Sequence, residues 1–252
     1  MKKLFFSISL VFLLFLTSVY SASADTLIAY PMEGQSQGPG DTADGIGEVV
    51  FVDEIFTDIN NRATASQSSM VSNPIKAMLQ ASFNTDQFQL LSRGFMSFDT
   101  SVIGEFDSID SGTLSLSGTF KEADLGENDL WVVRWPCNSV GVCYFVDIFT
   151  FNDSENDELA SIDYFSFNDA SAYNDLTLNS AGLDNVEPEG ITGYATKFAW
   201  EAADSFTGSW SFGGRNSYWY TSSDQAGTAE DPKLTIEYTP GVAPDFFTRF
   251  YE

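Results

Sequence analysis

The sequence contains no histidine in its 252 residues. Imidazole is the usual general base of serine and cysteine nucleophiles and a common ligand of zinc. The G-x-S-x-G elbow of α/β-hydrolases and the G-x-x-x-x-G-K-[ST] phosphate loop are also missing. These absences exclude histidine-dependent triads, P-loop chemistry and, with only two cysteines present, a zinc site of the ordinary type.

Basic residues are scarce, since eleven Lys and Arg stand against thirty-six Asp and Glu, a formal net charge of −25. Binding to phosphate backbones requires Lys and Arg that release counterions. We therefore expect no nucleic-acid partner and no attraction to anionic membranes, and polyanionic glycans are disfavoured unless calcium bridges the two. Solubility in an extracellular medium is the simplest explanation of the acidity.

The first 24 residues have the order of a secretory signal peptide. Lys2 and Lys3 precede an apolar run over residues 4–20, and Ala22 and Ala24 occupy the two small positions of a cleavage site. An uncleaved anchor is the alternative, because about 17 apolar residues can span a bilayer, but the A-x-A site favours cleavage. The mature chain is then predicted to be extracellular or at the cell surface, without membrane insertion, and it keeps nine basic and thirty-six acidic residues, a net charge of −27.

The two cysteines, Cys137 and Cys143, are separated by the sequence Asn-Ser-Val-Gly-Val. A C-x-x-C redox or zinc motif needs a different spacing. In an exported protein, such a pair is predicted to close a small disulfide loop.

Alternation of apolar and polar residues dominates the blocks 93–100, 112–120 and 231–238. Leu114 and Leu116 alternate with Thr113 and Ser115, which is the period of a half-buried strand. The single helix expected is 180–186, and Pro188 ends it after a short run. Further strands are predicted at 26–31, 48–56, 75–83, 88–91, 94–99, 130–135, 143–151, 164–167, 175–179, 193–200, 209–212 and 218–222.

Many short strands separated by Gly, Asn, Asp or Pro predict an all-β chain, namely a single antiparallel jelly-roll-like β-sandwich. We place it at residues 47–239. Residues 25–46 form a preceding strand and linker, 57–73 a long surface loop within the domain, and 240–252 a C-terminal tail.

Five motifs occur in the order found in a known family: residues 93–101, 109–116, 171–179, 191–200 and 227–238. With these motifs the sequence resembles the DNRLRE-type, or disaggregatase-related, domains of secreted bacterial, archaeal and phage-associated surface proteins. The resemblance implies a jelly-roll sandwich that acts as a non-catalytic module, and some members look like carbohydrate-binding modules. It also implies that Phe95 and Phe98 pack in the core, that Arg93 and Asp99 fix strand ends, and that Pro232 opens the last strand.

Aromatic side chains are the candidate sugar-binding groups, because sugar rings stack their C–H faces on exposed aromatic rings. Trp135, Tyr218 and Tyr220 are predicted as the exposed set, with Trp210 on a late strand beside them. Alternation places Trp219 on the face opposite to the two tyrosines. Packing in the core is the alternative role for all of them.

An acidic turn supplies candidate ligands for calcium at Asp153, Glu155, Asp157 and Glu158. Carboxylate oxygens at alternate positions suit a hard cation, although the turn lacks the Gly and distal Glu of an EF-hand loop. A solvated turn without metal is the other interpretation.

Together these patterns predict a secreted, non-catalytic β-sandwich module for carbohydrate binding, adhesion or cell-surface structure, with a neutral polysaccharide or cell-surface glycan as partner. The alternative is a glycan-active hydrolase, since glycoside hydrolysis needs only two carboxylates at a suitable separation. Glu201, or Glu105 with Asp107, are candidates for that role among many acidic residues of a solvated surface.

Overall fold

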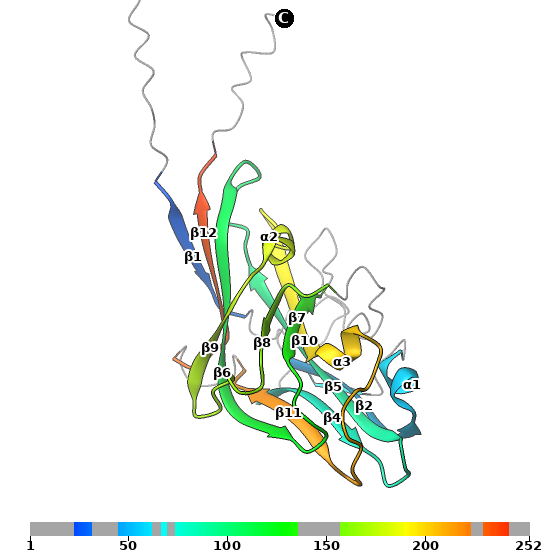
Figure 1. The fold of residues 1–252 in the computed structure, drawn as a ribbon. Helices are drawn as coiled ribbons and strands as arrows, with labels where there is room; N and C mark the ends of the chain where they lie inside the picture. Colours follow the sequence, from blue (N-terminus) through cyan, green and yellow to red (C-terminus); the bar gives the residue numbers. More distant parts are fainter. Residues whose placement is uncertain are drawn as a thin grey trace, which may run out of the picture.

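A computed structural model describes residues 23–31, 45–61, 67–69, 74–135, 157–222 and 229–241. These residues form an all-β protein with three short helices, α1 (Phe56–Asn60), α2 (Ser180–Asp184) and α3 (Ala199–Ala202). The predicted all-β class is confirmed (Figure 1). The strands are β1 (Asp25–Ala29), β2 (Gly45–Glu54), β3 (Gln67–Ser69), β4 (Ile75–Ala81), β5 (Phe88–Asp99), β6 (Ser108–Ala123), β7 (Leu130–Arg134), β8 (Ala160–Ile162), β9 (Ala172–Thr177), β10 (Ile191–Phe198), β11 (Arg215–Tyr220) and β12 (Lys233–Thr239).

The strands join in one antiparallel sheet with the order β1-β12-β6-β11-β4-β5-β10-β7-β8. Two long strands have several partners each. Along one edge β5 pairs first with β4 and then with β10, while β2 occupies its other edge. Similarly, β6 pairs with β12 and then β11 along one edge and with β9 on the other. Each long strand therefore joins two successive neighbours along one edge into a single continuous sheet.

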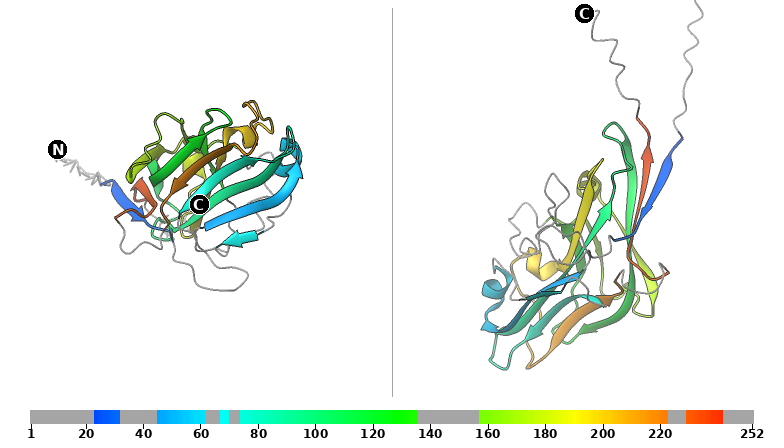
Figure 2. Two further views of the ribbon diagram at one scale, coloured as in Figure 1. Left: turned by 90° about the horizontal axis from the view of Figure 1, so that it is seen from below. Right: turned by 180° about the vertical axis from the view of Figure 1, so that it is seen from behind.

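The sheet curls until β8 approaches β9, as the views in Figure 1 and Figure 2 show. The link is made beyond the strand ends, where the main-chain N–H of Asn179 donates to the carbonyl of Leu159 at 2.8 Å. The Asn179 side chain also donates to the carbonyl of Glu158 and accepts the N–H of Gly182 at the start of α2. One asparagine thus closes the curl and caps a helix.

Most predicted strands are confirmed in place, and the lysine-containing segment 76–80 is a strand as expected. The two strands expected at 88–91 and 94–99 form a single β5, because Ser92 and Arg93 continue the pairing with β2. The helix expected at 180–186 is α2, at Ser180–Asp184. The strand expected at 143–151 lies outside the described residues.

Three local predictions are wrong. Residues 164–167 form a turn, since the carboxylate of Asp163 accepts the N–H groups of Phe165 and Ser166 at 3.0 Å each. Residues 209–212 form a loop that turns at Gly213, where φ is +66°. Helix α1 occupies the start of the expected surface loop, and β8 was not predicted, because three residues are too few for an alternation signal.

Of the expectations for individual residues of the family motifs, some are confirmed and one is wrong. Phe95 and Phe98 are fully buried, as expected, and Pro232 directly precedes β12. Arg93 does not fix a strand end, because it lies in the middle of β5 and is 3% exposed. The sheet also begins before Gly47, since β1 pairs with β12 from Asp25 to Ala29.

Gly94 of β5 lies at a tightly packed point of the core, beside its cross-strand partner Thr196. A Cβ at this position would lie 2.2 Å from the Tyr220 hydroxyl, 2.6 Å from Oγ1 of Thr196 and 2.7 Å from the side chain of Ile75. The hydroxyls of Tyr220 and Thr196 hydrogen-bond to each other at 2.7 Å, so neither is free to move aside. Only a residue without a side chain fits here.

We predict that Gly94→Ala lowers the free energy of unfolding by about 1–3 kcal/mol, because overpacking forces the buried hydroxyl pair apart. Urea unfolding of both proteins measures the difference. Gly190→Ala is the matched control, since its Cβ would meet ordinary contacts of 3.4 Å and longer. Equal losses in the two variants would show that Gly94 is not a packing constraint.

Candidate functional site

The predicted exposed set of aromatic residues is wrong. Trp135 and Tyr218 are 1% exposed and Tyr220 is 0% exposed. The Tyr218 hydroxyl donates to the carbonyl of Asn128 at 2.5 Å, and burial raises the pKa of Tyr218. The ring of Trp135 packs on Phe95, with 4.6 Å between the ring centroids. These three side chains belong to the core and cannot stack on an external sugar.

The alternation behind that prediction is nevertheless correct. Trp219 lies on the other face of β11, where its ring contacts Phe120 of β6 at 4.8 Å. The alternation along β11 assigns the tyrosines and Trp219 to opposite faces of the strand, but it does not show which face is covered by the rest of the protein. The curled sheet places the tyrosine face inside.

Trp210 is half-buried and stands at an exposed aromatic cluster. Its indole N–H donates to the carbonyl of Gln87 at 3.0 Å, which fixes it beside the β4–β5 turn. Phe83 in that turn and Phe212 in the loop before β11 are each 66% exposed. Their ring centroids lie 4.7 Å apart with the planes tilted by 56°. We call Phe83, Trp210 and Phe212 the aromatic tip.

The two loops of the aromatic tip are held by their own hydrogen bonds. In the β4–β5 turn, the hydroxyl of Ser82 accepts the N–H of Asn84 at 2.7 Å, and the N–H of Ser82 donates to Gln87 at 2.9 Å. Between the loops, the N–H of Ala81 donates to the carbonyl of Gly214 at 2.9 Å. Figure 1 shows the β4–β5 turn and the segment leading into β11 side by side at one end of the sheet. Phe83 and Phe212 therefore lie on two short loops that internal hydrogen bonds hold in place.

Polar residues follow Phe83 in the β4–β5 turn. Asn84, Thr85 and Asp86 are exposed in the same turn and offer an amide, a hydroxyl and a carboxylate. Asp86 has φ of +58°, the left-handed conformation that a tight turn requires. Exposed ring faces flanked by such donors and acceptors suit a ligand with apolar faces and many hydroxyls.

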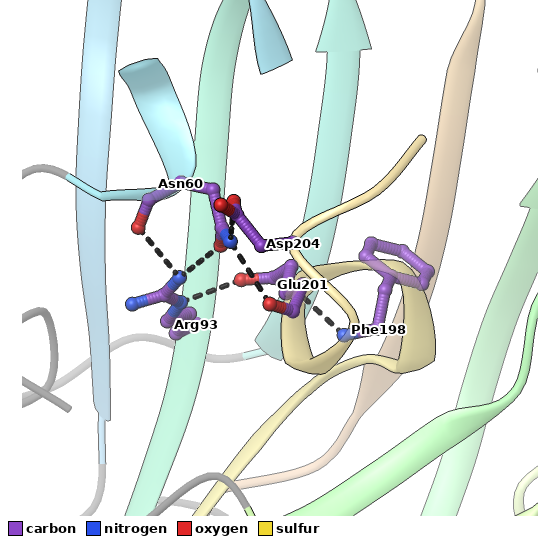
Figure 3. Close-up of polar contacts among 5 residues, drawn as sticks. All are labelled: Asn60, Arg93, Phe198, Glu201 and Asp204. Carbon is purple, nitrogen blue, oxygen red and sulfur yellow. Dashed lines mark hydrogen bonds and ion pairs between the residues drawn. The ribbon is translucent and has the colours of Figure 1, made fainter. Parts of the chain in front are cut away.

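A buried ion pair organises the region around α1 and α3, as Figure 3 shows. Arg93 Nε lies 2.5 Å from Oε2 of Glu201, and the two side chains are 3% and 0% exposed. Arg93 Nη2 also donates to the side-chain oxygen of Asn60 at 2.7 Å. Asn60 in turn donates to the Glu201 carbonyl and to the Asp204 carboxylate, both at 2.9 Å. We call this group the Arg93 cluster.

Glu201 is fully occupied by the Arg93 cluster and its helix. Its second oxygen, Oε1, accepts the N–H of Phe198 at 2.8 Å, so both oxygens have partners. A carboxylate held this way fixes α3 to β5 and does not present a free oxygen to a glycosidic bond. The other candidates lie elsewhere: Glu105 is exposed, and Asp107 accepts the N–H groups of Gly104 and Gly241 at 2.7 and 2.8 Å.

The calcium prediction falls partly outside the described residues, which include Asp157 and Glu158 but not Asp153 and Glu155. Glu158 accepts the hydroxyl of Ser161 at 2.7 Å. Burial, followed by the carboxylates of Asp163 and Glu158, raises the pKa of Asp129, so these three acids share one region. In the described part of the chain, no three metal-binding side chains gather closely enough to hold an ion.

Cys137, Cys143 and the predicted signal peptide up to residue 22 also lie outside the described residues. Within the described ranges, no helix has the length and apolar character needed to cross a bilayer. No family model matches the chain, and no curated protein matches it.

Removing one charge of the Arg93 cluster should be costly, because the other charge is left buried and unpaired. We predict that Glu201→Gln lowers the free energy of unfolding by about 3–5 kcal/mol. Glu187→Gln is the matched control, since its pair with Arg134 is 3.9 Å long and about half exposed, and it should cost less than about 1 kcal/mol. Chemical unfolding of both variants measures the costs, and similar losses would contradict the assignment.

Lys197 lies 1% exposed close to the same charges. Burial, and then Arg93, lowers the pKa of Lys197 from 10.5 to about 8, against the opposing effect of Glu201. Below pH 8 the ammonium is charged in both states and its burial costs stability. Between pH 8 and 10.5 the folded state releases the proton first, so stability rises with pH.

We therefore predict that the native chain gains stability relative to Lys197→Met as the pH rises from 8 to 10.5. The shift of the pKa from 10.5 to about 8 corresponds to a gain of about 3 kcal/mol. Urea unfolding at a series of pH values measures the difference between the two proteins. A difference in the free energy of unfolding that stays constant from pH 8 to 10.5 would show that folding does not lower the pKa of Lys197.

Proposed function

We propose that this protein is an exported, non-catalytic β-module that binds a neutral carbohydrate chain at the aromatic tip, in the service of adhesion or cell-surface structure. The supporting observation is the pair of rings of Phe83 and Phe212, each two-thirds exposed and 4.7 Å apart. Large aromatic rings left in water at adjacent positions are costly unless a ligand covers them. Sugar rings offer C–H faces that do so.

The construction of the aromatic tip favours binding over mere exposure. Trp210 bridges the two loops through Gln87, and the turn hydrogen bonds hold Asn84 and Ser82 in place. A site that is ordered before its ligand arrives loses little conformational entropy on binding. The hydroxyl and amide groups of Thr85 and Asn84 can then select the orientation of the sugar.

The charge of the chain narrows the choice of glycan. With nine basic and thirty-six acidic residues after removal of residues 1–24, a net charge of −27, the protein repels sulfated or uronate-rich polymers at low salt. The β4–β5 turn, which carries Phe83, has Asp86 but no basic side chain among its exposed residues 83–86. A neutral polysaccharide is the ligand class that fits both facts.

We also propose that the curled sheet is a jelly-roll-like β-sandwich of the DNRLRE type, exported after removal of residues 1–24 and stapled by Cys137 and Cys143. The antiparallel pairing throughout the sheet and the two successive partners that β5 and β6 each have along one edge support the sandwich. The motif order described above supports the family. We further propose that the acidic turn at residues 153–158 binds calcium.

A panel of neutral polysaccharides tests the function by affinity electrophoresis of the chain without residues 1–24. We predict that Phe83→Ala and Phe212→Ala each weaken binding about three- to tenfold, the value of one aromatic stacking contact. Both residues are exposed, so the free energy of unfolding should change by less than about 0.5 kcal/mol.

Phe165→Ala is the matched control, because Phe165 is 71% exposed but lies on the turn after β8, away from the aromatic tip in the sequence. It should bind like the native chain. Absence of binding to every neutral polysaccharide, or equal losses in all three variants, would refute the proposal. Cleavage of a glycan in the same panel, abolished by one Asp or Glu substitution, would favour the hydrolase instead.

A further inference from the structure

The strand β1 is an open edge of the sheet. Among the described strands β1 pairs only with β12, from Asp25 to Ala29. The chain after it makes a single bridge to β5, between Pro31 and Phe98, and no strand pairs with the other edge of Asp25–Ala29 in the described residues. An unpaired strand edge presents a row of N–H and C=O groups that can accept another strand. Natural edges are usually protected by charge or Pro, but here Ile28 is 54% exposed in the middle of the edge strand.

A hollow of about 240 Å³ lies along this edge. An apolar cavity of about 150 Å³ already accepts a benzene ring, so the hollow has room for one aromatic side chain. Val102 and Tyr30 line it together with Ile28 and are 62% and 38% exposed. Asp99 adds a carboxylate, and hydrogen bonds from Ser101 lower the pKa of Asp99, which keeps it ionised.

Residues 244–252 have the complementary chemistry. Their sequence, Pro-Asp-Phe-Phe-Thr-Arg-Phe-Tyr-Glu, combines four aromatic residues with Arg249 in a chain that has only eleven basic residues. The segment starts a few residues after β12, the partner strand of β1. In an extended strand, Phe246 and Phe250 share one face while Phe247, Arg249 and Tyr251 share the other.

We propose that residues 242–252 of one copy bind as an added strand along the open edge of β1 in a second copy, with an aromatic side chain in the hollow and Arg249 beside Asp99. Main-chain hydrogen bonds supply the affinity in such strand addition, and side-chain pockets supply the specificity.

The topology favours a second copy over the same chain. Because β1 runs antiparallel to β12, the segment that follows β12 would have to cross the end of β1 and then run parallel to it. Parallel pairing is the less stable arrangement, whereas a segment from another copy can approach in the antiparallel direction. Each copy then offers one edge and one segment, which is a head-to-tail contact that builds open chains.

Sedimentation velocity of the chain comprising residues 25–252 tests the inference. We expect dimers and longer species to grow with concentration, and an added peptide of residues 242–252 to dissolve them. The double variant Phe246→Ser/Phe250→Ser should remain monomeric. Asp99→Arg should weaken self-association by roughly two- to fivefold, the range of an exposed charge pair, and Arg249→Asp in the same chain should restore it.

Glu127→Arg, an exposed change between β6 and β7, controls for the gain of positive charge and should not weaken self-association in the same way. A chain that stays monomeric at every concentration would overturn the inference. So would oligomers that neither the phenylalanine variant nor the peptide affects, or a charge reversal at Asp99 that Arg249→Asp fails to rescue. Binding of polysaccharide at the aromatic tip is a separate measurement and should persist in all of these variants.

Discussion

The contact between Arg93 and Glu201 is the interaction on which the packing around the helices depends. Burying two charges costs several kcal/mol per ion unless their remaining hydrogen-bonding groups are satisfied. Asn60 and the N–H of Phe198 satisfy them here. Helices of four or five residues have no stability of their own, so α1 and α3 are held by this cluster and by the aromatic side chains beneath them.

Those aromatic side chains connect the Arg93 cluster to the aromatic tip. Phe56 of α1 and Trp200 of α3 both contact the ring of Phe206, at 5.9 and 4.8 Å. Phe206 contacts Phe88 at 5.0 Å, and Phe88 directly follows Gln87, the residue that anchors Trp210. The buried charges therefore support the far end of the β4–β5 turn through a continuous chain of packed rings.

Residue periodicity predicted most of the strands, because a half-buried strand has to alternate. It could not identify the covered face of β11, since Tyr218 and Trp219 look equally suited to the core until the curl of the sheet is known. Nor could it find the Arg93 cluster, whose members come from segments about 33 and 108 residues away from Arg93 in sequence. Phe83 and Phe212 were not predicted as site residues for a similar reason, since a single phenylalanine in a turn belongs to no periodic pattern.

The pairing of β1 with β12 has a mechanical consequence. The first residue of β1 lies opposite Tyr238 near the end of β12, so both strands leave the sheet at the same end (Figure 1). A force that pulls the two ends apart would break the hydrogen bonds between β1 and β12 one residue pair at a time, beginning at Asp25. A chain anchored through one end alone would leave these hydrogen bonds unloaded.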